Sequence, residues 1–233
     1  PKTAWPPTCL NIPIAGLART GFIPFVNTFA VFLTTRGADP VQSLIAYDSL
    51  NVKLCGAYCG LSDSYDGASH QAITDMAFVR SIPNMTVIAT ADGTETRKAV
   101  FAIAEHQGPV YLRLSRAPAP VFYGDNMRFE IGKGIRVREG NDVSIITTGT
   151  LLHNAIRAAL LLEQEGIQAA VVDMHTVKPI DQNLILECAE QTGAIVTAEE
   201  LGVCRQRVVI VFEDAVGDGS ASIHYFNDFA DGE

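Results

Sequence analysis

The sequence predicts an α/β protein made of two sandwich domains, each with a mainly parallel sheet. Short β-branched apolar runs alternate with helix-forming segments in both halves of the chain, and a proline-rich stretch separates the halves. Strands that alternate with helices in this way pair in parallel through right-handed crossovers. The length of 233 residues and the hydrophobic content of 48% allow each domain a core of its own.

The second half of the chain has the clearer pattern. Strand, helix, strand, helix and strand are expected, in this order, over residues 142–149, 150–166, 167–174, 181–193 and 194–200. Gly166 and Gly193 are placed to stop the two helices, and Asp181 is placed to cap the start of the second. His175 and Lys178 fall between a strand and a helix, so their segment is expected to be a loop.

The first half repeats the alternation with less regular segments. A strand that turns helical, a strand, a helix, a strand, a helix and a strand are expected over residues 22–36, 51–60, 70–82, 85–92, 96–108 and 110–115. Asp92, with Glu95 three positions later, has the spacing of a capping box. We therefore expect a first domain over residues 1–118, an extended linker over 119–126 and a second domain over 127–233.

Charge and cysteine content narrow the functional classes. The net charge of −9, without a dense cluster of Lys and Arg, argues against nucleic acid or an anionic membrane surface as the main partner. No apolar run approaches the ~20 residues that span a bilayer, and the first residues lack the apolar core of a signal peptide. Scattered cysteines without a C-x-x-C pair predict no structural zinc site and suit a reducing, cytoplasmic location.

Several polar and aromatic side chains follow expected strands, which is where open parallel sheets bind their ligands. These residues are Phe29, Phe32, Asp66, His70, Ser115 and Arg116. A carboxylate near a histidine sets the tautomer and pKa of the imidazole, and an arginine offers a fork to a carboxylate or phosphate. If the fold brings Asp66, His70 and Arg116 together, they would suit a small, polar, anionic substrate.

The residues alone leave a purely structural interpretation open. Asp66 and Gly67 form a typical turn pair, His70 can simply begin a helix, and Arg116 can be a solvated charge. Phe29 and Phe32 have the i, i+3 spacing of core side chains as well as of a surface on which an aromatic ring stacks.

Four longer segments decide between these interpretations, because together they resemble the transketolase family of thiamine-diphosphate enzymes. The segments are GFIPFVNTFAVFLTTR, YDGASHQAITDMAFVRSIPNMTVIATAD, ETRKAV and VYLRLSR. More narrowly, the chain resembles the C-terminal subunit of a split transketolase from about residue 17 to about residue 200. The resemblance implies a pyrimidine-binding domain followed by a transketolase C-terminal domain.

The resemblance also implies roles for the candidate residues. Phe29 and Phe32 would contact the aminopyrimidine ring of thiamine diphosphate, and the catalytic residues Asp66 and His70 would hold sugar hydroxyls or assist proton transfer. Arg116, with Ser115 beside it, would bind the phosphate of the sugar substrate. The reaction would move a two-carbon ketol unit from a ketose phosphate to an aldose phosphate, with the cofactor carrying the difficult step.

Three features depart from the family pattern. No glutamate occurs near Pro13 and Ile14, where the family has its catalytic glutamate, and the tail after residue 200 matches loosely. Tyr58 and Tyr65 replace a histidine and an acidic residue of the loop. Either the chain has truly diverged, or loop residues are missing at these places.

The resemblance also implies a partner. The family holds Mg²⁺ and the diphosphate with a G-D-G motif and a later Asn, but the G-D-G at Gly217 lies too near the chain end for that Asn. We therefore expect no metal ligands in this chain, a separate N-terminal subunit for the Mg-diphosphate half, and a homo- or hetero-oligomer. A non-catalytic assembly or regulatory subunit, a deoxyxylulose-phosphate synthase and the β subunit of a 2-oxo-acid dehydrogenase E1 stay open as alternatives.

Overall fold

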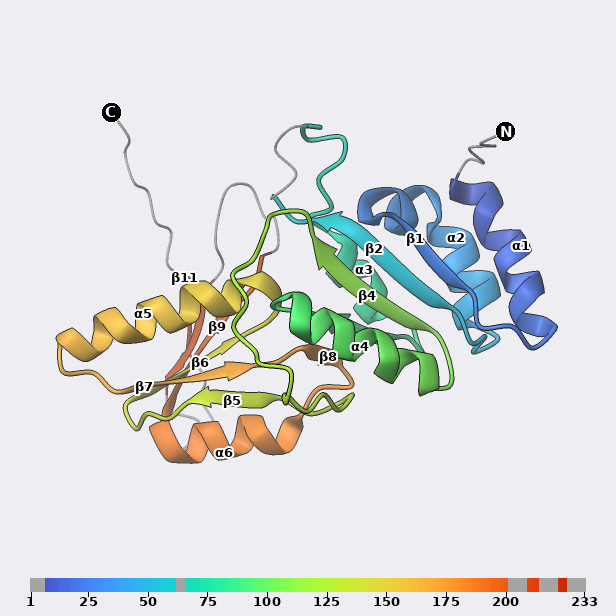
Figure 1. Cartoon of the computed structure of the whole chain (residues 1–233). Helices are drawn as coiled ribbons and strands as arrows, with labels where there is room; N and C mark the ends of the chain where they lie inside the picture. Colours follow the sequence, from blue (N-terminus) through green and yellow to red (C-terminus); the bar gives the residue numbers. More distant parts are fainter. Residues whose placement is uncertain (1–6, 62–65, 201–208, 214–221, 226–233) are drawn as a thin grey trace.

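The structure is a computed structural model that describes residues 7–61, 66–200, 209–213 and 222–225. Two α/β units, each built on its own sheet, lie side by side (Figure 1). Both sheets have parallel strands at their centre and antiparallel strands at an edge. The predicted fold class is therefore confirmed.

The first sheet has the strand order β1-β2-β4-β3-β8. Its strands are β1 (Phe25–Phe29), β2 (Lys53–Cys59), β3 (Thr86–Ala89), β4 (Val110–Ser115) and β8 (Thr176–Lys178). The first four of these pair in parallel, and neighbouring residues point to opposite faces. Leu54 of β2 thus joins the core on one face of the sheet, and Cys55 joins the core on the other.

Helices cover both faces of this sheet, as a parallel sheet requires. One face packs against α1 (Pro7–Arg19), α3 (Asp75–Ser81) and the π-helical segments η1 (Phe32–Arg36) and η2 (Val41–Ala46), which flank α2 (Ala38–Pro40). The other face packs against α4 (Gly93–Glu105), through Ala99 and Ile103. No helix among the described residues combines the length and apolar character needed to span a bilayer.

The second sheet has the strand order β11-β10-β9-β6-β7-β5. Its strands are β5 (Ile135–Arg138), β6 (Val143–Thr147), β7 (Ala169–Asp173), β9 (Ala194–Ala198), β10 (Val209–Glu213) and β11 (Ser222–Tyr225). The central strands β6, β7 and β9 are parallel. The 3-10 turn η3 (Gly149–Leu151) leads into α5 (Leu152–Gln164), which covers one face, and α6 (Gln182–Thr192) covers the other (Figure 1).

The predicted helix ends are confirmed. Asp92 caps α4 by accepting a hydrogen bond from the Glu95 amide at 2.8 Å, and Asp181 caps α6. Gly193 ends α6 in the left-handed conformation, with a φ of 68°. The capping box is incomplete, however, because the Glu95 side chain accepts a hydrogen bond from the amide of Ala91, one residue before the cap.

The prediction of a loop holds at His175, which lies outside any helix or strand, but is wrong at Lys178. Residues Thr176–Lys178 form β8, which pairs antiparallel with β3 of the first sheet. The Ala89 amide donates to the His175 carbonyl at 2.9 Å, and the Lys178 ammonium donates to the carbonyl of Ile82. A strand of three residues has no periodicity of its own, so its pairing with the other domain is what makes it a strand.

The helix predicted from His70 begins later, at Asp75. Turns and bends occupy the segment from Asp66 to Thr74, where Gly67 has a φ of 73°. The delay has a physical cause: Ala72 forms a parallel bridge with Cys59, and an extended residue cannot lie inside a helix.

Two buried carboxyl groups meet where the domains touch. Glu95 of α4 and Asp173 of β7 are close enough for their side chains to hydrogen-bond. Burial raises the pKa of both groups, and the nearby charge of Asp92 raises them further. Glu95 Oε1 and Asp173 Oδ1 find no donor among the described residues unless one carboxyl is protonated. A proton held by one of the two carboxyls would let it donate to the other and so join the two domains here.

Glu95→Gln is expected to flatten the pH dependence of stability. The native state keeps a proton that the unfolded chain releases, so the wild-type free energy of unfolding falls as the pH rises from about 5 to about 8. Because an amide donates to Asp173 at every pH, the difference between variant and wild type should change by at least about 1.4 kcal/mol over this range. Urea unfolding measures it, with exposed Glu105→Gln as the control. Parallel pH curves for Glu95→Gln and wild type would contradict a proton held between these carboxyls.

Candidate functional site

The carboxyl ends of three parallel strands lie together on one side of the first sheet. The edge at the site means this side, where the strands end, and not an outermost strand. β1 ends at Phe29, β2 at Cys59 and β4 at Ser115, and the connection from β2 to α3 extends from this edge (Figure 1). The β2–β4 pairing shifts between Gly56 and Cys59, so that β2 holds one extra residue in a bulge. Tyr58 lies in the bulge with a φ of 61°, a conformation that is rare for bulky side chains. The bulge lets the Tyr58 ring lie on Phe29.

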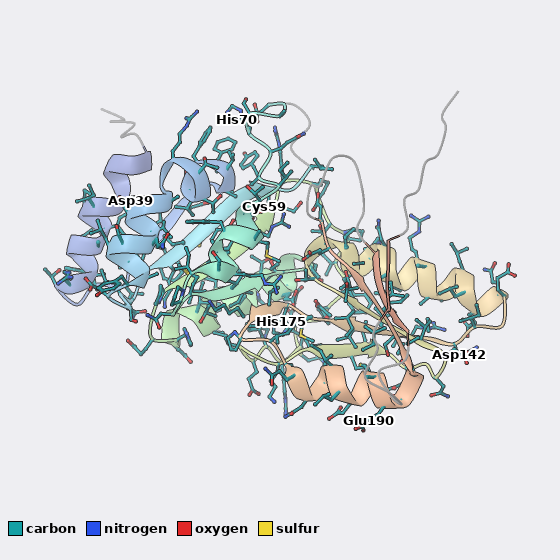
Figure 2. All side chains as sticks on the ribbon, turned by 180° about the vertical axis from the view of Figure 1, so that it is seen from behind. Asp39, Cys59, His70, Asp142, His175 and Glu190 are labelled. Carbon is teal, nitrogen blue, oxygen red and sulfur yellow. The ribbon has the colours of Figure 1, made fainter. Side chains whose placement is uncertain are left out.

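Four aromatic rings form a cluster at this edge. The Tyr58 and Phe29 rings stack with their centroids 4.4 Å apart. The His70 imidazole meets Phe29 and Phe32 edge-on, with centroid distances of 5.3 and 5.1 Å. Figure 2 shows His70 in the connection beyond Cys59, at the outer side of the sheet. Phe29 and Phe32 are half-buried, so the cluster is a partly open surface rather than part of the core.

Asp66 and Arg116 form an ion pair beside the aromatic cluster. Arg116 Nη1 donates to Asp66 Oδ2 at 2.9 Å, and both side chains are partly exposed. The Arg116 guanidinium also lies over the Tyr58 ring, 5.0 Å from its centroid. Asp66 thus pairs with the arginine, whereas Nδ1 of His70 lies 3.0 Å from the Ser69 hydroxyl. A partly exposed guanidinium held in this way can bind an anionic ligand.

Ser115 has a different environment from the other candidate residues. It closes β4 opposite Cys59 and lines a pocket of about 430 Å³. The pocket lies between the start of α4 and the segment after β4, and Asp92, Thr96 and Val121 also line it. The structure therefore brings together five of the six residues predicted as a site, and places Ser115 at the border of a neighbouring pocket.

A buried ion pair joins β4 to the start of α3 next to these strand ends. Arg113 Nε donates to Asp75 Oδ2 at 2.9 Å, and the Tyr111 hydroxyl donates to the same oxygen at 2.8 Å. Asp75 is fully buried and Arg113 is almost so. Burial, together with the charge of Asp75, raises the pKa of Tyr111, so its hydroxyl stays a donor. In the sequence, Asp75 falls inside the helix predicted over residues 70–82 and has no visible partner, so this network is seen in the structure alone.

The aromatic side chains of the site can hold a flat ring. Phe29, Phe32 and Tyr58 offer stacking surfaces to an aromatic heterocycle. Within the described parts of the chain, no three His, Cys, Asp or Glu side chains are grouped to bind a metal ion. The first glutamate of the sequence is Glu95, which lies at the domain contact, and α1 runs through Pro13 and Ile14 without an acidic residue.

Two family models match the chain. The transketolase pyrimidine-binding domain matches residues 14–120, and the transketolase C-terminal domain matches residues 132–223. The first match covers the strands whose ends form the candidate site, and the second covers the strands from β5 to β10 and the start of β11. This order of domains is the one that the resemblance of the four sequence segments implies.

Curated relatives include subunits of transketolases. The 6-deoxy-6-sulfo-D-fructose transketolase subunit SqwH of Clostridium sp. (strain MSTE9) is 42% identical over 189 residues, covering 81% of this chain and 59% of the relative. An apulose-4-phosphate transketolase subunit of Phocaeicola vulgatus is 38% identical, covering 80% and 60%. The human transketolase is 38% identical, covering 82% and 31%. The match thus spans about three fifths of the subunits and about a third of the human enzyme.

Solved structures agree with these matches. A split-gene transketolase, described as an inactive beta4 tetramer, has a TM-score of 0.79 and 44% identity, covering 85% of this chain and 64% of that one. The transketolase of Campylobacter jejuni has a TM-score of 0.68 and 21% identity, covering 84% and 31%. The second likeness is one of fold only.

Asp75→Asn is expected to lower the free energy of unfolding by about 3 to 5 kcal/mol, because it leaves the buried Arg113 charge without its counter-charge. Asp125→Asn is the matched control: it breaks an exposed pair with Arg97 and should cost no more than about 1 kcal/mol. Equilibrium urea unfolding of both variants at neutral pH measures the two losses. Equal losses would contradict the special role of the buried pair.

Proposed function

Because the chain belongs to the transketolase family, we propose that it is the C-terminal subunit of a split, thiamine-diphosphate-dependent transketolase. Such an enzyme moves a two-carbon ketol unit between sugar phosphates. The observation that carries the proposal is the meeting of the aromatic cluster with the Asp66–Arg116 pair at one sheet edge. A stacking surface and a cationic anchor at the same edge suit a flat cofactor ring beside an anionic substrate.

Phe29 and Phe32 would hold the aminopyrimidine ring of thiamine diphosphate, since both rings are half-buried and lie at the end of β1. When bound, the cofactor supplies the carbon nucleophile that accepts the two-carbon unit. The diphosphate and Mg²⁺ would be held mainly by an N-terminal partner subunit, since no three His, Cys, Asp or Glu side chains of the described residues are grouped to hold a metal ion. The G-D-G at Gly217 lies outside the described residues. The active form would therefore be an oligomer of both subunits.

Arg116 would bind the anionic end of the sugar, with Ser115 beside it in the sequence. The two split relatives are named for a sulfosugar and for a sugar phosphate, which both carry an anionic group. Asp66 holds the guanidinium in place and has oxygens that can accept from a sugar hydroxyl. His70 can exchange a proton with a sugar oxygen, because its ring belongs to the aromatic cluster and is only half-buried.

A second candidate function is a non-catalytic subunit that assembles or regulates an enzyme. The observation that favours it is that no glutamate occurs near Pro13 and Ile14, where the resemblance to the family places the catalytic carboxylate. The solved split-gene relative is itself described as an inactive tetramer of one subunit type.

Reconstitution separates the two candidates. The chain is mixed with an N-terminal transketolase subunit, thiamine diphosphate and Mg²⁺, and ketol transfer from xylulose 5-phosphate to ribose 5-phosphate is measured. We expect transfer only when both subunits are present. No transfer by a stable complex of the two subunits would favour the assembly function, and transfer by the isolated chain would overturn the need for a partner.

Arg116→Gln is expected to raise the KM for the phosphorylated substrate about ten- to a hundredfold, with a smaller change in kcat, because one charge-assisted interaction is lost. Arg97→Gln is the control, since Arg97 also pairs with an aspartate but is exposed on α4. Steady-state kinetics of the reconstituted enzyme measures both. An unchanged KM in Arg116→Gln would remove Arg116 from the substrate site.

A further inference from the structure

Glu200, two residues beyond β9 of the second domain, contacts the connection that carries Asp66 and His70 in the first. Its Oε1 accepts a hydrogen bond from the Leu61 amide at 3.1 Å. A Cβ atom on Gly60 would come within 2.5 Å of the Glu200 carboxyl, and Gly60 has a φ of 69°. Both the conformation and the missing side chain at residue 60 therefore make room for a carboxylate from the other domain.

Glu200 is itself held by the buried ion pair. Arg113 Nη2 donates to the Glu200 carbonyl at 2.9 Å, while Arg113 Nε is bound to Asp75. The Arg113 guanidinium thus links the start of α3 to the segment that follows β9 of the second domain. Since Asp75 and Arg113 are buried and charged, this arrangement has few alternatives of similar energy.

The backbone at the start of the connection between β2 and α3 is also hydrogen-bonded to the backbone near its end. The Gly60 amide donates to the Ala72 carbonyl at 2.9 Å, and Cys59 forms its bridge with the same residue. His70 precedes Ala72 by two residues, and its ring meets Phe29 and Phe32. A shift of Gly60 and Leu61 would therefore move the backbone that presents His70 to the aromatic cluster.

We propose that Glu200 is a positioning residue: it fixes Gly60 and Leu61, and through Ala72 the placement of His70 and Asp66. The second domain then supplies the side chain that aligns the candidate site of the first domain. Only the catalytic consequence of this inference rests on the proposed function. Its structural consequence can be tested on the isolated chain without any activity.

Amide hydrogen exchange tests the structural consequence. In Glu200→Ala, the amides of residues 60–61 and 66–72 should exchange about tenfold faster, as expected for one lost hydrogen bond to a charged acceptor. Glu200→Gln keeps an acceptor oxygen and should stay within about twofold of wild type. Glu190→Ala, exposed on α6, is the matched control (Figure 2). Wild-type exchange in Glu200→Ala, equal acceleration across both domains, or no protection in Glu200→Gln would each overturn the proposal.

Gly60→Ala provides a second test that does not remove the carboxylate. The new methyl group would displace the Glu200 carboxyl, so residues 60–61 and 66–72 should again exchange faster. In a Glu200→Ala background the collision is gone, and Gly60→Ala should accelerate exchange less than it does alone. Effects that simply multiply would show that the two residues act separately and would overturn the proposal.

Kinetics of the reconstituted enzyme test the catalytic consequence. Glu200→Ala should lower kcat/KM for the phosphorylated sugar about tenfold, and Glu200→Gln should restore most of it, because a misplaced His70 and Asp66 weaken contacts to substrate. Unchanged kinetics together with faster exchange would overturn positioning as a catalytic role. If the wild-type complex transfers no ketol unit, the proposed function fails, while the exchange experiments still decide whether Glu200 positions the connection.

Discussion

The buried ion pair between Asp75 and Arg113 is the interaction on which the geometry of the candidate site depends. Two charges withdrawn from water are stable only when nearby groups complete their hydrogen bonds. Tyr111 donates to Asp75 Oδ2 and the Glu200 carbonyl accepts from Arg113, although Asp75 Oδ1 finds no donor among the described residues. These bonds link β4, the start of α3 and the segment that follows β9. The site therefore lies above a polar support that favours one arrangement, rather than above an apolar core that tolerates several.

Three contacts of different physical kinds join the second domain to the first. β8 adds backbone hydrogen bonds to the first sheet, the buried carboxyls of Glu95 and Asp173 have raised pKa values because of their burial, and Glu200 accepts from the Leu61 amide. The β8 contact is insensitive to pH, whereas the carboxyl pair weakens as the pH rises. A contact made of all three kinds holds the domains in one orientation, which the geometry at Glu200 requires.

Much of the fold could be predicted from the sequence, because helices and parallel strands have patterns that repeat within one element. Asp92 and Asp181 cap helices where their spacing predicts them, and Leu54 and Cys55 alternate between faces. β8 and the late start of α3 could not be predicted, since each depends on a partner far away in the chain. The same holds for the site. Strand ends predicted the neighbourhood of Asp66, His70 and Arg116, but not that Asp66 pairs with Arg116 rather than with His70.

Tyr58 explains why the aromatic and cationic parts of the site act as one unit. Its ring stacks on Phe29 on one side and lies under the Arg116 guanidinium on another, so it joins the aromatic cluster to the Asp66–Arg116 pair. A histidine at this position would add a titratable charge next to Arg116, whereas the tyrosine ring attracts the guanidinium without adding charge. The bulge in β2 is what aims this ring, and the bulge ends at Cys59 and Gly60, where Glu200 and Ala72 hold the backbone. The strain at Tyr58 is thus balanced by contacts to both domains, which ties the shape of the cluster to the contact between them.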